Sequence, residues 1–322
     1  MIRFILGRLL RAVVILLFIA IFNFLLIHMA PGDPAAVMAG EAGDTDPIFL
    51  QQLRERFGLD QPLYMQLWIY VSSIAQFDLG FSYRQSLPVI DLITDRLPAT
   101  LLLSLSAFVI SLLLGVVGGA IASARQGRIS DMVISFVALL FYATPLFWLA
   151  LMGVLLFSVQ LTWLPGFGYE TVGANYTGFD RVLDIAHHLV LPSLTLGLFF
   201  MAVYVRMTRA SMLEVNQLDF VKTAKAKGLR PALIQRRHVL RNALLPVVTL
   251  AGLQAGQLVS GAVLIETVFA WPGIGRLMFD ALSQRDYNLL LGVFMVSAAM
   301  VLLFNLITDV LYRLVDPRIK EA

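Results

Sequence analysis

The sequence contains no cysteine and is poor in charged residues. The absence of cysteine among 322 residues excludes disulfide bonds, thiolate zinc sites, iron–sulfur clusters and thiol catalysis. Only 14% of the residues are charged and 59% are hydrophobic, whereas a soluble domain has about 25% charged and about 45–50% apolar residues. The excess of apolar residues must face something other than water, and lipid is the natural candidate. The formal net charge of +3 is too small to indicate nucleic-acid binding.

Six segments lack Asp, Glu, Lys and Arg and are long enough to be membrane spans, since about 20 apolar residues cross a hydrocarbon core of about 30 Å. The first could also be a cleaved signal peptide, because Arg3, Arg8 and Arg11 precede it, but no convincing small-residue cleavage site follows. The third is overlong and ends in an interfacial tail. We predict an all-α integral membrane protein with six transmembrane helices at 12–27, 99–124, 132–164, 189–205, 242–265 and 287–308.

The distribution of basic residues predicts that both termini are cytoplasmic. With the N-terminus inside, 17 of the 24 Lys and Arg residues lie on the cytoplasmic side, nine of them in the loop 206–241. Cytoplasmic loops carry an excess of Lys and Arg, so this orientation is favoured over its opposite. The basic residues left outside are Arg54, Arg56, Arg84, Arg96, Arg181, Arg276 and Arg285.

The predicted spans divide the chain into three parts. Residues 1–98 comprise an anchor helix and a helical extracytoplasmic segment, with helix-like apolar spacing at 49–57 and 63–75. Residues 99–316 form a five-helix core that includes the cytoplasmic loop 206–241, and residues 317–322 are a cytoplasmic tail. Small residues four apart allow helices to approach closely, and the pairs that show this spacing are Gly115 with Gly119 and Gly252 with Gly256.

Several kinds of chemistry lack the residues they need. The phosphate-binding pattern GxxxxGK[ST] is absent, so the chain cannot bind ATP by that route. An ion-coupled secondary transporter usually carries ionisable groups within its spans, but here Glu266 and Asp309 lie only at span ends. No histidine belongs to an HExxH motif. His187 and His188 are adjacent and so do not share a helix face; interfacial residues explain them more simply than a metal site does.

The loop 206–241 is the most informative part of the chain. Residues 213–227 are compatible with a helix, Gly228 fits the position that follows a helix, and Pro231 fits the first turn of a new one. Two short helices that meet at Gly228 would form an elbow able to insert into a groove on a partner protein. A solvated basic loop attracted to anionic lipid headgroups is an equal alternative at this point.

Residues 219–228, DFVKTAKAKG, resemble the EAA loop of ATP-binding-cassette importer permeases. The wider chain is similar to the B-type membrane subunit of dipeptide/oligopeptide permeases, and the resemblance covers nearly its whole length. Lys222 stands where the name-giving glutamate is found, and Thr223 stands for the first alanine. The other matching motifs lie at 28–34, 58–63, 78–80, 96–100, 206–209, 240–246, 266–273, 285–287 and 316–318.

The resemblance implies a permease subunit in a bacterial inner membrane, with no catalytic residue, metal or cofactor of its own. It implies four kinds of partner: a second related permease, two ATPase subunits that bind ATP and Mg, an extracytoplasmic binding protein and the lipid bilayer. Di- or oligopeptides are the expected cargo, with nickel chelates, glutathione and glycosides as alternatives. The residues expected to couple to an ATPase are Asp219, Lys222, Thr223, Ala224, Ala226, Lys227, Gly228 and Leu229.

The predicted orientation can be tested with reporter fusions. Fusions at Gly43 and Gly173 are expected to report an external location, whereas fusions at Gly127, Gln217 and the C-terminus report an internal one, because the basic loops stay in the cytoplasm. Paired enzymatic reporters, one active only outside and one only inside, measure this. A cytoplasmic signal at Gly43 would refute the orientation.

Overall fold

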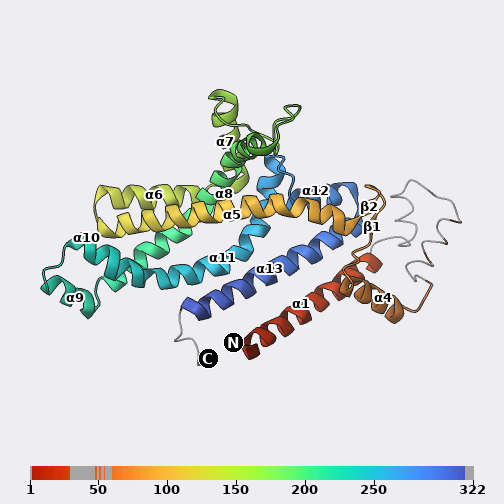
Figure 1. Cartoon of the computed structure of the whole chain (residues 1–322), viewed down its shortest axis with the longest axis horizontal. Helices are drawn as coiled ribbons and strands as arrows, with labels where there is room; N and C mark the ends of the chain where they lie inside the picture. Colours follow the sequence, from red (N-terminus) through yellow and green to blue (C-terminus); the bar gives the residue numbers. More distant parts are fainter. Residues whose placement is uncertain (1, 30–47, 49–50, 52–53, 55–59, 316–322) are drawn as a thin grey trace. The chain divides into compact units, whose positions relative to one another are not determined.

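The computed structural model describes residues 2–29, 48, 51, 54 and 60–315, and most of these residues are helical (Figure 1). The strands in this part of the chain are β1 (Phe81–Ser82) and β2 (Leu87–Pro88), which pair antiparallel with Phe81 opposite Pro88. The predicted all-α membrane fold is confirmed. The chain forms two compact units, residues 1–99 with 273–306 and residues 100–272 with 307–322, and each is described by itself below.

Four helices in the described part of the chain are long and apolar enough to cross a membrane. They contain the first, second, fourth and sixth predicted spans. The fifth falls in α11 (Arg241–Val268), whose side chains at residue 253 and residues 255–261 lie outside the described set. The number of six spans and their orientation therefore stay predictions. The four helices are α1 (Ile2–Met29), α5 (Val89–Ala124), α8 (Gly178–Val215) and α13 (Tyr287–Val315).

The third predicted span is divided in two. It contains α6 (Ile129–Ala143) and then α7 (Leu146–Gly153), which continues as the π-helical segment η1 (Val154–Gln160), and the two parts meet at an angle of 103°. The break lies at Thr144, whose backbone is extended with φ −80° and ψ 132°. Pro145 explains it, because a proline disfavours the helical conformation of the residue before it. The prediction of one continuous span is thus wrong, and residues 161–164, where the interfacial tail was expected, follow the second helix.

In the first unit, hydrogen bonds tie the N-terminal helix α1 to the next long helix of the described residues. The predicted helix at 63–75 is α4 (Leu63–Ala75), while the one at 49–57 lies largely outside the described residues. His28 Nε2 of α1 lies 2.9 Å from Gln66 Oε1 of α4. Gln66 Nε2 in turn donates to the Gln61 carbonyl at 2.7 Å, which fixes the orientation of the amide.

The β hairpin of the same unit is anchored to the start of α13. Asp286 caps this helix, because its Oδ1 accepts the Leu289 N–H at 3.1 Å. Its Oδ2 accepts a hydrogen bond from the Ser82 hydroxyl at 2.5 Å, and both side chains are buried. The helix that precedes this cap is α12 (Ile274–Gln284), which ends at Arg285 in the left-handed conformation.

In the second unit, glycines bring α5 and α8 into close contact. A Cβ atom added at Gly115 would lie 2.2 Å from Tyr204 Cβ, and one added at Gly119 would lie 2.6 Å from Thr208 Cβ. Only a residue without a side chain allows the two helices to approach this closely. The first predicted glycine pair, Gly115 with Gly119, therefore lies in the α5–α8 interface.

Replacing Gly119 by alanine is expected to destabilise the protein, because its Cβ would lie 2.7 Å from the Val205 carbonyl oxygen, which belongs to the backbone and cannot rotate away. Overpacking of this kind costs about 1–3 kcal/mol. Gly118→Ala is the matched control, since its Cβ meets no backbone atom and only two side-chain methyl groups, those of Val205 at 3.3 Å and Ile134 at 3.5 Å. Thermal unfolding in detergent should show a lower Tm for Gly119→Ala only; equal values would contradict the packing.

Candidate coupling site

The candidate coupling site begins where α8 ends. The sequence predicted one helix over 213–227, but α8 stops at Val215 and a separate helix, α9 (Asp219–Ala226), begins after a turn. Leu218 in this turn is extended, with φ −72° and ψ 150°. Just before it, Asn216 Oδ1 accepts a hydrogen bond from Gln235 Nε2 at 2.9 Å. A side chain 19 residues away thus binds at the end of the helix, a contact that local spacing does not reveal.

Gly228 forms the elbow that the sequence predicted. Its φ is +73°, in the left-handed region that only glycine adopts without strain. The Gly228 N–H donates to the Lys225 carbonyl at 3.0 Å and the Leu229 N–H to the Ala224 carbonyl at 3.4 Å. These two bonds are the Schellman arrangement that closes a helix end. The elbow is therefore a defined turn and not a loose linker.

The chain then re-enters helical structure at the predicted proline. Pro231 occupies the first turn of α10 (Pro231–Leu233), where its missing N–H costs nothing. This short helix continues into the π-helical segment η2 (Ile234–Leu240), which leads directly into α11. In Figure 1, α9 and α10 lie together at the junction between α8 and α11.

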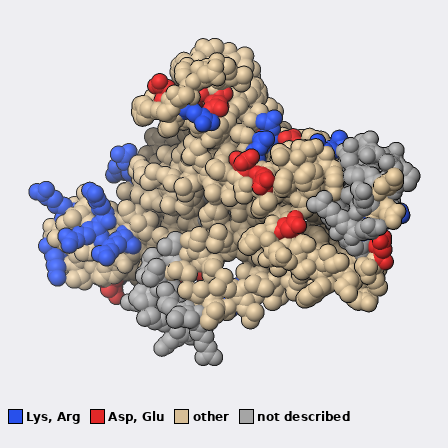
Figure 2. Space-filling model, turned by 45° about the vertical axis from the view of Figure 1, so that its right-hand side comes forward, with Lys and Arg blue, Asp and Glu red and all other residues tan. Residues whose placement is uncertain are grey.

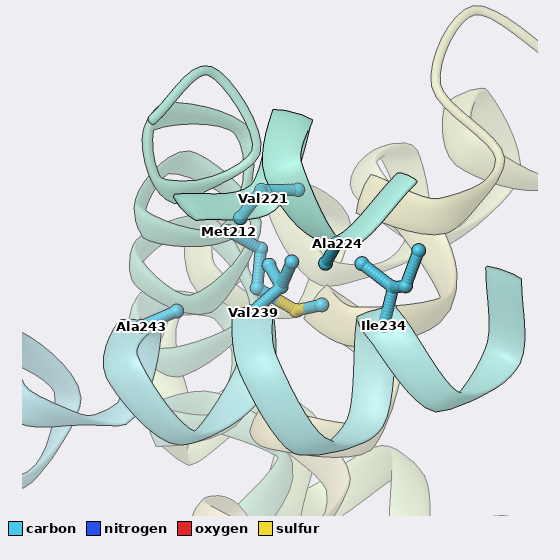
Figure 3. Close-up of a cluster of buried hydrophobic side chains, with 6 residues drawn as sticks. All are labelled: Met212, Val221, Ala224, Ile234, Val239 and Ala243. Atoms are coloured by element: carbon cyan, nitrogen blue, oxygen red, sulfur yellow. The ribbon is translucent and has the colours of Figure 1, made fainter. Parts of the chain in front are cut away.

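A cluster of buried apolar side chains holds the elbow against the ends of α8 and α11 (Figure 3). Val221 and Ala224 of α9 point toward Met212 of α8, and η2 supplies two more residues from the other side. Burying apolar side chains of this size contributes about 1.5–3 kcal/mol each, so the elbow is tied to two long helices. The members of the cluster are Met212, Val221, Ala224, Ile234, Val239 and Ala243.

The structure separates the residues predicted to couple into two groups. Ala224 is buried, with an exposed fraction of 5%, and Leu229 is partly buried against the same cluster, so both stabilise the elbow from within. Lys222 pairs with Asp219 at 2.8 Å, but both are well exposed, and such a pair contributes little stability. The predicted residues that remain exposed are Asp219, Lys222, Thr223, Ala226, Lys227 and Gly228.

Three large apolar side chains of the site were not predicted. Leu218, Phe220 and Leu233 are 46%, 42% and 42% exposed, although they lie in the most polar stretch of the chain. Phe220 directly precedes the buried Val221, so on α9 it must turn toward a different face. The sequence signal for an exposed apolar contact residue was Phe220, an aromatic residue next to a position that faces inward. It could be recognised only once the structure showed that Val221 is the buried neighbour.

Basic side chains surround these apolar residues. Figure 2 shows Lys and Arg gathered over α9 and the segment that follows it. Because like charges this close repel each other, the patch favours an acidic partner surface or anionic lipid headgroups. The exposed basic residues are Lys222, Lys225, Lys227, Arg230, Arg236, Arg237 and Arg241.

The histidines and the carboxylate that the sequence analysis considered for metal binding or ion coupling have structural partners. His187 Nε2 lies 3.1 Å from the Trp163 carbonyl and His188 Nδ1 lies 2.9 Å from the Asp184 carbonyl. Within the described residues, no group of three or more metal-binding side chains is present. Glu266 is fully buried and accepts a hydrogen bond from the Thr100 hydroxyl at 2.7 Å, so this carboxylate belongs to the packed interior of the chain.

Two known protein families match the two parts of the chain. The family described as "Binding-protein-dependent transport system inner membrane component" matches residues 111–321. The family of the N-terminal part of such membrane components matches residues 1–106. The first of these matches contains the whole candidate coupling site.

Characterised relatives are similar over nearly their full length. The dipeptide transport system permease protein DppB of Alkalihalophilus pseudofirmus is 38% identical over 99% of this chain and 100% of its own. The di/tripeptide permease protein DppB of Pseudomonas aeruginosa is 42% identical over 94% of both chains. The glutathione transport system permease protein GsiC of Escherichia coli K12 is 39% identical over 99% of both chains.

A solved structure supports the fold. A chain of the methionine ABC transporter MetNI in an inward-facing conformation superposes with a TM-score of 0.57, covering 70% of this chain and 96% of that one at 18% identity.

The apolar helices and these matches define an integral membrane transport subunit, not an enzyme. The chain belongs to the family of inner membrane components of binding-protein-dependent transport systems. It is a multi-pass permease subunit of an ATP-binding-cassette importer, a class that works with ATPase and substrate-binding partners.

The backbone geometry of the elbow allows the effect of a Gly228→Val substitution to be predicted. No atom lies within 4 Å of a Cβ at this position, so the variant suffers from its positive φ and not from a clash. A β-branched residue tolerates this conformation poorly, and the turn is expected to open. The variant should insert in the membrane yet lose most uptake and most stimulation of ATP hydrolysis by the binding protein, measured in reconstituted vesicles.

Gly173→Val is the matched control for this variant. Gly173 has a φ of +81° and equally open surroundings, but it lies outside the coupling site. Its replacement should leave uptake nearly unchanged. Normal uptake by Gly228→Val would show that the chain does not need the Gly228 elbow for coupling.

Proposed function

We propose that this chain forms one half of the membrane pathway of an ATP-driven importer of short peptides. The observation that carries the proposal is its identity of 38–42% to dipeptide and di/tripeptide permeases over nearly the whole chain. The other half is a second, related permease subunit. An extracytoplasmic binding protein delivers the peptide, and two ATPase subunits bind ATP and Mg.

The exposed face of the elbow is the surface that meets an ATPase subunit. Leu218, Phe220 and Leu233 supply apolar contact area, and the lysines around them supply positive charge. Apolar anchors inside a charged rim are the usual anatomy of a protein interface. This composition favours a protein partner over a lipid headgroup layer, because three large apolar residues on a compact elbow fit a groove better than a charged surface.

The elbow transmits motion because it is packed on both sides. Its apolar cluster joins α9 to Met212 of α8 and to Ala243 of α11. When the ATPase subunits close on ATP, the elbow is displaced with them, and the two long helices follow as one body. This is rigid-body motion about a packed contact, a common form of conformational coupling.

Selection of the peptide belongs mainly to the binding protein. The predicted spans contain no Asp, Glu, Lys or Arg, so the pathway through this chain demands no fixed counter-charge from the cargo. Discrimination between ligands needs such attractive or repulsive contacts. A pathway lined by small apolar and hydroxyl groups accepts peptides with many kinds of side chain.

Glutathione is the second candidate cargo. The glutathione permease GsiC of Escherichia coli K12 is 39% identical over 99% of both chains, nearly as similar as the dipeptide permeases. Glutathione is itself a modified tripeptide, so both candidates belong to one chemical class. Purified binding protein titrated with dipeptides, tripeptides and glutathione separates them.

The test of the function is an exchange of binding proteins in the reconstituted complex. Vesicles that hold both permeases and both ATPases should take up the peptide preferred by whichever binding protein is added, provided that it docks. Stimulation of ATP hydrolysis reports docking, and labelled peptide inside the vesicles reports uptake. If docking persists but uptake still follows the original cargo, selectivity resides in the permease and the proposed pathway is wrong.

A further inference from the structure

An ion pair lies on α8 just before the coupling site. Arg209 of α8 donates two hydrogen bonds to Asp131 of α6, from Nε to Oδ1 at 2.7 Å and from Nη2 to Oδ2 at 2.8 Å. The side chain of Asp131 is 6% exposed and that of Arg209 is 32% exposed. Paired contacts of this geometry fix both distance and orientation, unlike the single contacts of exposed lysines.

The carboxylate is held by its own turn as well. Asp131 Oδ2 accepts the N–H of Gly127 at 3.0 Å, and Gly127 has a φ of +73° in the turn between α5 and α6. Asp131 also lies in the first turn of α6, where a negative charge is favoured by the helix dipole. The Arg209 guanidinium is therefore bound to a preorganised acceptor that belongs to the α5–α6 turn.

The same level of the molecule contains the contacts of the coupling site. Gly119 of α5 lies against the backbone of α8 at this height, since a Cβ atom added at Gly119 would be 3.1 Å from the backbone nitrogen of Arg209. Ala120 of α5 packs on the apolar cluster that holds the elbow. Further along α6, Ala138 already packs against Met201 and Val205 of α8. The Arg209 ion pair adds a polar contact between the same two helices at the end that carries the α5–α6 turn.

We propose that the Asp131–Arg209 pair is a clamp that makes the α5–α6 turn move with the coupling site. The inference rests on the proposed function and deepens it. Arg209 and Asp131 are positioning residues, because they act through α8 and α6 and touch neither ATP nor peptide. Without the clamp the elbow still binds the ATPase, but part of its displacement is lost as slippage between α8 and α6.

The experiment measures the number of ATP molecules hydrolysed for each peptide imported by the complete reconstituted transporter. Arg209→Gln should leave co-purification of the ATPases intact and raise this ratio about fivefold or more, the lower end of typical coupling between sites. Asp131→Asn should act in the same direction, and the double variant should be no worse than either single variant, because the two side chains act as one unit.

Arg206→Gln is the matched control. Arg206 lies one turn earlier on α8, is exposed, and has no ion pair within the part of the chain that the structure describes. Its loss removes the same charge from the same helix, so the ratio should stay at the wild-type value. An equal rise in Arg206→Gln would overturn the proposal, because general loss of positive charge would then suffice.

The absence of cysteine from the chain permits a direct mechanical test. Asp131→Cys together with Arg209→Cys, assembled with cysteine-free partners, should show the raised ratio. A short bis-methanethiosulfonate, which links the two thiols through disulfide bonds and releases methanesulfinate, should restore coupling until a reducing agent cleaves the link. A ratio that the reagent leaves unchanged would overturn the clamp. The proposal would also be overturned if the Arg209→Gln complex assembled and kept the wild-type ratio. If none of these variants assembled, the pair would be needed for folding and the clamp would likewise be overturned. Absence of peptide uptake by the wild-type complex would instead count against the proposed function.

Discussion

The hydrocarbon core of the membrane imposes the constraint on which this structure depends. No water is present there to bind exposed peptide groups, so the backbone must satisfy its hydrogen bonds within helices. The hydrophobic effect does not draw apolar helices together in lipid, and their contact relies on close packing. The glycines of α5 meet this need, because Gly115 and Gly119 allow the backbone of α8 to approach directly. Charge is left for the ends of the helices, and the working parts of the chain lie there.

The coupling site has a different physical basis, since it lies at the end of the helices. Amphipathic burial organises it: Val221 and Ala224 face inward and the lysines of α9 face outward. The Schellman turn at Gly228 fixes the angle of the elbow with two backbone hydrogen bonds. A rigid elbow on a packed cluster can pass a displacement to α8 and α11, whereas a flexible basic loop could not. This is why the packing supports a coupling role over simple attraction to lipid.

Local chemistry explains which elements could be predicted. The helix at 63–75, the turn at Gly228 and the helix start at Pro231 each depend on residues close in sequence, and all three occur as predicted. The break of the third span at Thr144 also has a local cause in Pro145. The sequence contained that signal, but a hydropathy window averages over it, so the bend of 103° was missed.

Other features have no local cause. The helix predicted over 213–227 is divided by a turn at 216–218, where Asn216 accepts a hydrogen bond from Gln235. Asp131 and Arg209 read as ordinary loop charges in the sequence, yet α6 and α8 bring them into a paired contact. Glu266 lies at the edge of a predicted span, and only the surrounding helices bury it completely. Each of these residues acquires its role from a partner far away in the chain.

The sequence by itself determined the class of protein, because composition and the spacing of apolar residues decide how a chain partitions between water and lipid. It also determined the elbow, since a glycine with positive φ and a proline at a helix start are properties of single residues. The tertiary structure decided which side chains of the candidate coupling site are exposed and which are buried within it. It also decided that Asp131 pairs with Arg209, because burial and ion pairing of this kind depend on distances between helices that no local pattern contains.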